Sequence, residues 1–176
     1  MTMTGHGNGT ATDVGLLLLR SAVGGTLFAH GAQKLFGWFG GPGLTATAGG
    51  MQAMGFEPGR PSAVVAGVSE TAGALMIAGI GTRACGALGA AAMVSAAAVS
   101  RPSGFFAQNG GYEYPAVLAA ACTALTLTGP GAISIDARTP HALDRERVAL
   151  AITVGAVSVS LGVVRARTLR LKNIAG

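Results

Sequence analysis

Four polar side chains lie within one long apolar stretch near the start of the chain. Residues 14–36 are mostly apolar but contain Arg20, His30, Gln33 and Lys34. A charged side chain inside a bilayer costs ~2.5 kcal/mol or more on insertion scales, so one that persists there usually has a partner, a water path or a ligand. In a helix, Lys34 lies roughly 40° from both Arg20 and His30. Gln33 lies about 60° from His30. We therefore expect one face of the first helix to carry all four.

These residue types can bind a lipid-soluble ligand that carries carbonyl oxygens. A quinone needs hydrogen-bond donors to its two carbonyl oxygens and an apolar slot, and His30, Gln33 or Lys34 can supply the donors. The alternative for Lys34 is that it extends to the membrane interface beside Trp38, as lysines at helix ends do. That alternative does not account for Arg20 and His30 in the same segment.

A carboxylate lies near the middle of the second apolar segment, residues 62–81. An unpaired carboxylate at that depth either takes up a proton or finds a cation. One possibility is a neutral Glu70 bonded to a serine or to the backbone. We favour a charged pair of Glu70 with Arg20 or His30, because the first helix offers both.

A second polar and aromatic cluster occupies the end of the loop of residues 101–113 and the position that follows it. The turn between the second and third segments, residues 79–83, is short enough to make those helices antiparallel neighbours. The loop is therefore expected on the same membrane side as His30. This places Asn109, Tyr112, Glu113 and Tyr114 at the level of the first cluster. The alternative is an ordinary interfacial belt of aromatic residues. The candidate ligand-binding residues are Arg20, His30, Gln33, Lys34, Trp38, Glu70, Asn109, Tyr112 and Glu113, with no catalytic residue assigned.

The composition is that of a membrane protein. Of the 176 residues, 50% are hydrophobic and 11% are charged, against roughly 25% charged in an ordinary soluble domain. The 29 glycines suit close helix packing in lipid. We therefore predict an all-α integral membrane protein. Five apolar segments are expected to cross, the last three only if the fit is snug, since a span needs ~20 residues. They are residues 14–36, 62–81, 84–100, 112–128 and 148–164.

The remaining segments define the expected organisation of the chain. Residues 1–13 are polar and lack the basic start of a secretory signal, so we expect a disordered N-terminal tail. Residues 14–137 form a membrane bundle, within which residues 44–54 make a short interfacial helix. Residues 138–147 form a polar loop. Residues 148–176 form an extra transmembrane helix with a basic tail.

The cysteines and histidines argue against an intrinsic cofactor. Cys85 and Cys122 lie in apolar segments and form no Cys-x-x-Cys pair, which thiol–disulfide chemistry normally needs. A haem held by two helix histidines is disfavoured because only His30 lies in a span, whereas His6 and His141 have polar surroundings. No metal site is expected, and a bound quinone is the one cofactor considered.

The net charge of +5 comes largely from the end of the chain. A basic block next to a membrane helix binds anionic lipid headgroups more often than nucleic acid. We expect anionic lipid at this tail and no nucleic-acid partner. The tail residues are Arg165, Arg167, Arg170 and Lys172.

Several runs resemble one family of bacterial membrane proteins. They are Leu19-Arg20, residues 30–43, residues 54–56, Glu70, residues 81–83 and residues 109–115. In order and spacing they resemble the DoxX family over residues 14–137. The resemblance implies a four-helix bundle in the bacterial cell membrane, to which residues 148–164 would add a fifth transmembrane helix. The family takes its name from a subunit of an archaeal thiosulfate:quinone oxidoreductase, and other members are linked to redox and thiol homeostasis.

Three functions compete at this point. The first is a membrane subunit of a redox-linked assembly that binds a quinone or lipid-like ligand, with other membrane or redox proteins as partners. The second is a non-catalytic scaffold or accessory subunit. The third is a small-solute or proton pathway through Glu70, Arg20 and His30, against which stands the lack of inverted repeats. No self-contained catalytic centre is visible, so an activity of the chain alone is not predicted.

The distribution of basic residues predicts the orientation. Apart from Arg20, seven lysines and arginines fall on the side of the basic tail and four on the other. Basic residues favour the cytoplasmic side, so the C-terminus is expected there. The seven are Lys34, Arg60, Arg101, Arg165, Arg167, Arg170 and Lys172, and the four are Arg83, Arg138, Arg145 and Arg147.

Overall fold

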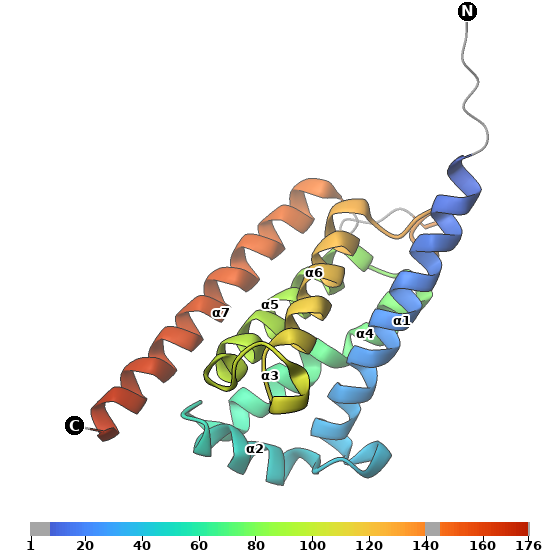
Figure 1. The fold of residues 1–176 in the computed structure, drawn as a ribbon. Coiled ribbons are helices and arrows are strands. Elements are labelled where there is room, and N and C mark those ends of the chain that lie inside the picture. Colours follow the sequence, from blue (N-terminus) through green and yellow to red (C-terminus); the bar gives the residue numbers. More distant parts are fainter. Residues whose placement is uncertain (1–7, 140–144, 176) are drawn as a thin grey trace, which may run out of the picture.

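The computed structural model describes residues 8–139 and 145–175, and the regular structure of these residues is entirely helical (Figure 1). The prediction of an all-α protein is therefore confirmed. The predictions for residues 1–7 and 140–144 lie outside the described residues. The helices are α1 (Asn8–Phe36), α2 (Gly43–Ala53), α3 (Gly59–Thr71), α4 (Gly73–Ala78), α5 (Thr82–Ser100), α6 (Glu113–Thr128) and α7 (Glu146–Ala175). Three short 3-10 turns, η1 (Trp38–Gly40), η2 (Arg101–Ser103) and η3 (Ala107–Asn109), lie in the connections.

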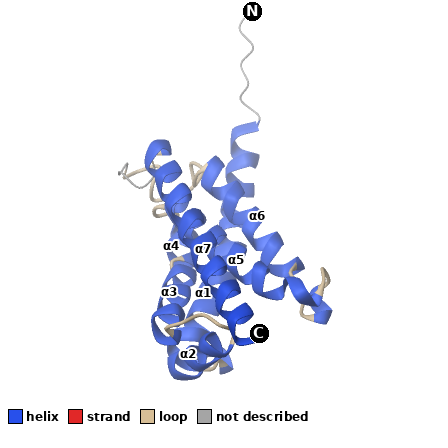
Figure 2. Cartoon of the chain, turned by 90° about the vertical axis from the view of Figure 1, so that its left-hand side faces the viewer, coloured by secondary structure: helices blue, strands red, loops and turns tan. Residues whose placement is uncertain are grey.

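The long helices run up and down and α2 lies across one end of them (Figures 1 and 2). Helix α1, the α3–α4 pair, α5 and α6 form a bundle, and α7 packs against the outer side of α5. The first described turn of α1 and the last turns of α7 lie at opposite ends of the molecule (Figure 1). The predicted alternation of direction along the chain is therefore observed.

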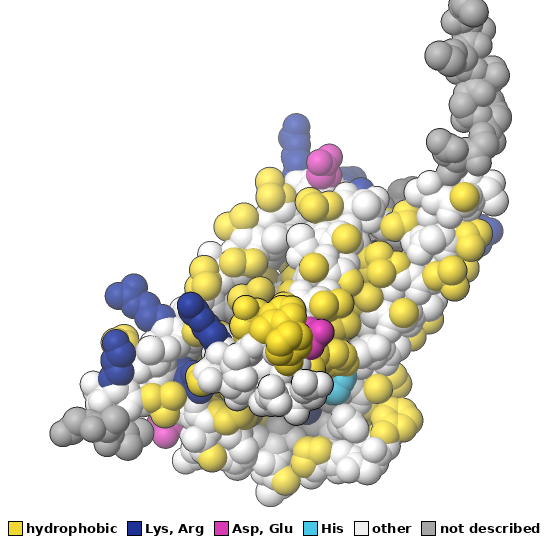
Figure 3. Space-filling model, viewed as in Figure 1, with side chains coloured by type: hydrophobic (Ala, Val, Ile, Leu, Met, Phe, Trp, Pro, Cys, Tyr) yellow, Lys and Arg dark blue, Asp and Glu magenta, His cyan; other side chains and the backbone are white. Residues whose placement is uncertain are grey.

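Four helical stretches are long and apolar enough to cross a membrane, namely Gly9–Phe36, Gly59–Ala78, Thr82–Ser103 and Glu146–Asn173. Helix α6 has 16 residues, or about 24 Å at 1.5 Å per residue, which is short of the ~30 Å hydrocarbon core. Hydrophobic side chains cover much of the outer surface of the long helices (Figure 3). The chain is a multi-pass, all-helical membrane protein.

Three predicted boundaries need correction. Helix α1 begins at Asn8, so residues 8–13 of the predicted tail are helical, and the Asp13 carboxylate accepts the Ala132 N–H at 2.8 Å. Helix α7 begins at Glu146 and includes the basic tail. The second apolar segment is two helices interrupted at Ala72. Apolarity marks the part of a helix that lipid covers, whereas the helices themselves extend further or break where packing requires it.

Glycines set the register of α1 against the α3–α4 pair. A Cβ on Gly31 would clash with backbone atoms of Gly67 and Thr71, and a Cβ on Gly24 would clash with the Gly73 carbonyl. Small residues allow this approach, which drives helix association where lipid offers no hydrophobic gain. The register places residues 31–35 of α1 opposite residues 67–71, at the C-terminal end of α3.

The core lies between α1, α4, α5 and α6. Its fully buried side chains include Leu27, Met76, Cys122 and Leu125. Cys85 is also buried, and neither cysteine forms a disulfide. Both thiols are packing groups of the core.

Candidate functional site

Lys34 and Glu70 form an ion pair at the end of the bundle that α2 covers. The Lys34 Nζ and Glu70 Oε2 atoms are 2.5 Å apart, and the side chains are 24% and 5% exposed. The prediction that Glu70 pairs with Arg20 or His30 is wrong. The glycine register brings α3 against the last turns of α1 at this point, so Lys34 is the cation within reach.

Helix α2 contacts α1 at Lys34, next to this pair. The Thr47 hydroxyl, buried on α2, donates to the Lys34 carbonyl at 3.2 Å. Because its ammonium group is directed to Glu70, Lys34 does not reach out to the interface on its own. The alternative in which Lys34 extends beside Trp38 is therefore not observed.

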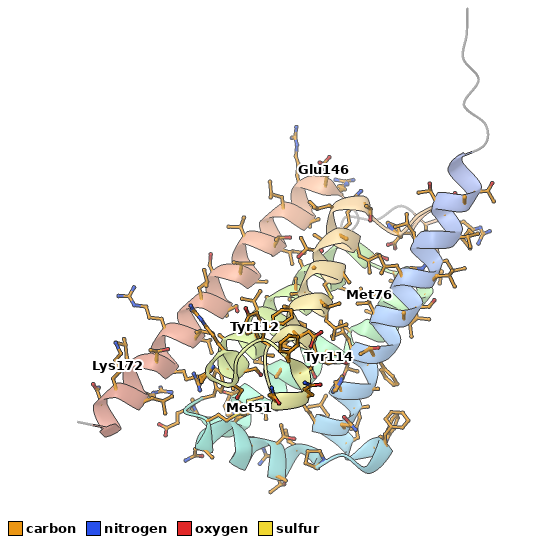
Figure 4. All side chains as sticks on the ribbon, viewed as in Figure 1. Met51, Met76, Tyr112, Tyr114, Glu146 and Lys172 are labelled. Carbon is orange, nitrogen blue, oxygen red and sulfur yellow. The ribbon has the colours of Figure 1, made fainter. Side chains whose placement is uncertain are left out.

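His30 and Tyr114 form a second polar pair, between α1 and α6. The His30 Nε2 and Tyr114 Oη atoms are 2.9 Å apart, and either group can donate, depending on the histidine tautomer. Tyr114 lies at the start of α6 on the side that faces α1 (Figure 4), and it is 44% exposed. His30 lies one turn from Lys34 on the same side of α1. The two pairs therefore make one cluster, which we call the α1–α6 site: His30, Lys34, Glu70 and Tyr114.

The candidate ligand-binding set did not include Tyr114. The sequence feature that points to Tyr114 is its place in the first turn of the fourth apolar segment, at the same membrane level as His30. Its neighbours Asn109, Tyr112 and Glu113 are the predicted ligand-binding residues of this loop. Sequence spacing gives the level of a side chain, but the rotation of α6 about its axis decides which one meets α1.

Asn109, Tyr112 and Glu113 build the loop at this end of the bundle. The Glu113 carboxylate accepts the Ala107 N–H at 3.0 Å, and the Tyr112 ring packs edge-on against Phe105. Asn109 is exposed in η3, where its backbone N–H donates to the Phe106 carbonyl. The three lie at the same end as His30, as expected. Within the part of the chain that the structure describes, their contacts are with the loop, and it is Tyr114 that hydrogen-bonds to α1.

Gln33 lies in the last turn of α1, and Trp38 lies in η1 directly after it. The Gln33 side-chain amide donates to the Phe39 carbonyl at 3.5 Å. The exposed Trp38 ring packs against Phe28, Phe36 and Phe39. The Trp38 ring, in η1, therefore packs on the face of α1 that carries Phe28 and Phe36 and not on the His30 face, in an aromatic cluster typical of a membrane interface.

Arg20 lies at the opposite end of the bundle. Its guanidinium donates to the Pro130 carbonyl at 2.9 Å and to the Ile133 carbonyl, and its side chain is 2% exposed. Arg20 and His30 are on one side of α1 only when the helix is viewed down its axis. Along the axis, ten residues separate them by about 15 Å. Arg20 is thus not part of the α1–α6 site.

Asp136 completes the structure around Arg20. Its carboxylate accepts the N–H groups of Gly81 and Thr82 at 3.0 and 3.2 Å, at the start of α5, and it attracts the Arg20 guanidinium. The loop of residues 129–139 is thereby fastened to α1 and to the α4–α5 turn. This cluster holds the bundle together at the end remote from the α1–α6 site.

The chemistry of the α1–α6 site is that of hydrogen bonding and proton exchange. A phenol and an imidazole on the bundle surface can each donate to or accept from a ligand oxygen. A buried carboxylate and an ammonium group lie directly behind them. Among the described residues, no group of three histidine, cysteine, aspartate or glutamate side chains is placed to hold a metal ion.

Comparison with known proteins defines the family. A search of curated proteins and of solved structures finds no match to the chain. The DoxX family model matches residues 15–102, which include His30, Lys34 and Glu70 but end before Tyr114 and α7. The match is shorter than the resemblance over residues 14–137, yet it covers half of the 176 residues. This protein therefore belongs to the DoxX family.

Proposed function

We propose that this protein is a membrane subunit of a redox-linked assembly and binds a quinone-like, lipid-soluble ligand at the α1–α6 site. The observation that carries the proposal is the hydrogen-bonded His30–Tyr114 pair, half-exposed at the bundle surface beside the buried Lys34–Glu70 pair. Ionisable side chains inside a membrane are costly, and they mark ligand or proton sites more often than inert structure.

The surroundings of the pair suit a flat ligand with an apolar tail. The Tyr114 hydroxyl and the His30 ring can donate to one carbonyl oxygen of such a ligand. Val117 lies one turn along α6 and is 63% exposed, so it offers an apolar surface on the same face as Tyr114. A few polar groups beside apolar surface are the usual composition of a small-molecule site.

The chain's own residues would bind the ligand and hold protons beside it. Reduction of a quinone consumes two electrons and two protons, and the His30–Tyr114 pair lies where a ligand oxygen would be protonated. Glu70 and Lys34 keep opposite charges behind that pair. We assign electron transfer to partner proteins, because the sequence has no Cys-x-x-Cys pair and one spanning histidine.

We place the protein in the bacterial cell membrane with the C-terminus on the cytoplasmic side. The family is bacterial by resemblance, and basic residues gather at the end of the bundle where α7 terminates. These include Arg60, Arg101, Arg165 and Lys172, all exposed. The positive-inside rule supports this orientation.

The test is photolabelling of the full chain in lipid nanodiscs with a short-tailed, photoreactive quinone. The expected result is labelling of α1 and α6 near His30 and Tyr114 that an excess of unlabelled quinone abolishes. Tyr114→Phe, which removes the hydroxyl, should reduce labelling several-fold, whereas Tyr112→Phe should not. If labelling resists competition, or if both variants label like the parent, the α1–α6 site is a structural cluster and the scaffold function stands.

A further inference from the structure

We infer that an anionic phospholipid headgroup binds where the end of α7 meets the connection between α2 and α3. A hollow of about 330 Å³ opens there and is lined by Gln52, Glu57, Pro58 and Arg170. We call it the α7 hollow. Its volume is within the range of ligand clefts, ~300–1,000 Å³. None of its residues belongs to the α1–α6 site.

Two arginines of α7 attach this helix to the connection. The Arg167 Nε–H donates to the Met54 carbonyl at 2.8 Å, and its guanidinium lies 5.5 Å from the centre of the Phe56 ring. The Arg170 Nη1 donates to the Glu57 carbonyl at 2.9 Å. The position of the Arg170 guanidinium is therefore set by a backbone contact before any ligand binds.

The attachment requires a residue without a side chain at position 55. Gly55 has φ +88°, and a Cβ on it would lie 3.2 Å from the Leu171 side chain. Leu171 thus packs directly on the connection. The α7 hollow is a fixed feature of how the two segments meet.

Charge identifies the kind of ligand. Residues 52–60 and 165–173 carry five basic side chains and one acidic side chain, a formal net charge of +4. In its hydrogen bonds to the described residues, Arg170 uses only its Nη1 atom, which leaves its other N–H groups for a ligand. A guanidinium binds phosphate oxygens through two parallel hydrogen bonds. The basic residues are Arg60, Arg165, Arg167, Arg170 and Lys172, and the acidic one is Glu57.

The exposed apolar surface of α7 beside the hollow identifies the ligand as a lipid. The stretch Glu146–Asn173 is apolar enough to span, and only 11% of its most apolar window is buried within the protein. Exposed apolar side chains, Leu161 and Leu169 among them, lie along the same helix. Basic side chains gather at the lower end of the same helix (Figure 3). Acyl chains along α7 would therefore bring a phosphate headgroup to Arg170.

The Glu57 carboxylate raises the choice between two headgroup classes, zwitterionic and anionic. It would attract the ammonium of a zwitterionic phosphatidylethanolamine and repel an anionic headgroup. The five basic side chains of these two segments outweigh this single carboxylate, so we commit to an anionic lipid. Helix α7 lies outside the region that the family model matches, whereas Gln52, Glu57 and Pro58 lie within it, so the site needs both parts of the chain.

The experiment is native mass spectrometry of the full chain in detergent with phosphatidylglycerol or phosphatidylethanolamine. Phosphatidylglycerol should be retained in preference. Arg170→Gln should lower its retention about fivefold, the effect of about one basic residue at a membrane surface. The matched control is Arg147→Gln, at the other end of α7, which should change nothing. Glu57→Gln keeps the backbone carbonyl that holds Arg170 and should raise retention.

The direction of the Glu57→Gln effect keeps the test decisive even if Arg170→Gln loosens α7. A preference for phosphatidylethanolamine that Glu57→Gln weakens would overturn the proposal in favour of a zwitterionic lipid. Equal losses in Arg170→Gln and Arg147→Gln would reduce the effect to general surface charge and also overturn it. Displacement of phosphatidylglycerol by an equal concentration of glycerol 3-phosphate would show that acyl chains contribute nothing, against the lipid assignment.

Discussion

Lys34 on α1 and Glu70 on α3 are joined by an ion pair of 2.5 Å that connects the two helices at the level of the candidate site. The carboxylate is nearly buried and the ammonium group is partly exposed. Lys34 lies one turn along α1 from His30, so the packing of the bundle and the polarity of the site depend on the same two side chains.

Glu70→Gln is expected to lower the melting temperature in detergent. Removing one member of a buried pair costs about 3–5 kcal/mol because it strands the other charge, and the partial exposure of Lys34 reduces this to about 2 kcal/mol. Glu113→Gln, which changes an exposed loop contact, is the control and should cost less. The double variant Lys34→Met/Glu70→Gln should recover part of the loss. Unchanged melting for Glu70→Gln would contradict the pair.

Arg20→Lys is expected to release the loop of residues 129–139. A lysine keeps the charge but loses the fork that reaches the Pro130 and Ile133 carbonyls. Loss of one charged, buried hydrogen bond costs about 2 kcal/mol. Hydrogen exchange in the loop should rise, while Arg138→Lys, on the exposed surface of the same loop, should leave it unchanged. Equal exchange in both variants would mean that Arg20 does not hold the loop.

Ser160→Leu is expected to separate α7 from α5. The Ser160 hydroxyl lies 2.7 Å from the Ser95 hydroxyl and donates to the Ala91 carbonyl at 3.0 Å. A leucine has no room there, whereas Ser160→Ala loses only hydrogen bonds worth about 0.6 kcal/mol in a membrane. The measure is cross-linking between cysteines introduced on facing positions of α5 and α7. Ser158→Leu, on the exposed side of α7, should preserve the cross-link.

Cysteines introduced at Asn8 and Asn173 are expected to react from opposite faces of the membrane. The start of α1 and the end of α7 lie at opposite ends of the bundle (Figure 1), and the two native cysteines are buried. With the proposed orientation, only the cysteine at position 173 should react with an impermeant reagent from the cytoplasmic side of inverted vesicles. Reaction of both from one face would rule out five crossings, and the reverse pattern would invert the orientation.

The sequence by itself determined the class of the protein, the order of its helices and the level of its polar groups. Apolar segments of spanning length leave few folds in a bilayer, because every backbone group must be paired within a helix. The alternation of successive spans then places His30 and the loop before α6 at one end, as the structure shows. Those inferences need only composition, spacing and chain direction.

Tertiary structure decided which of those groups meet. The close approach of Gly31 to Gly67 and Thr71 sets the register in which Glu70 forms an ion pair with Lys34. The rotation of α6 about its axis brings the Tyr114 hydroxyl within hydrogen-bond distance of His30. Arg20 finds its acceptors in a loop more than a hundred residues away along the chain. Each pairing depends on a helix rotation or sliding of a few ångströms, and side-chain packing fixes those quantities where helical periodicity leaves them open.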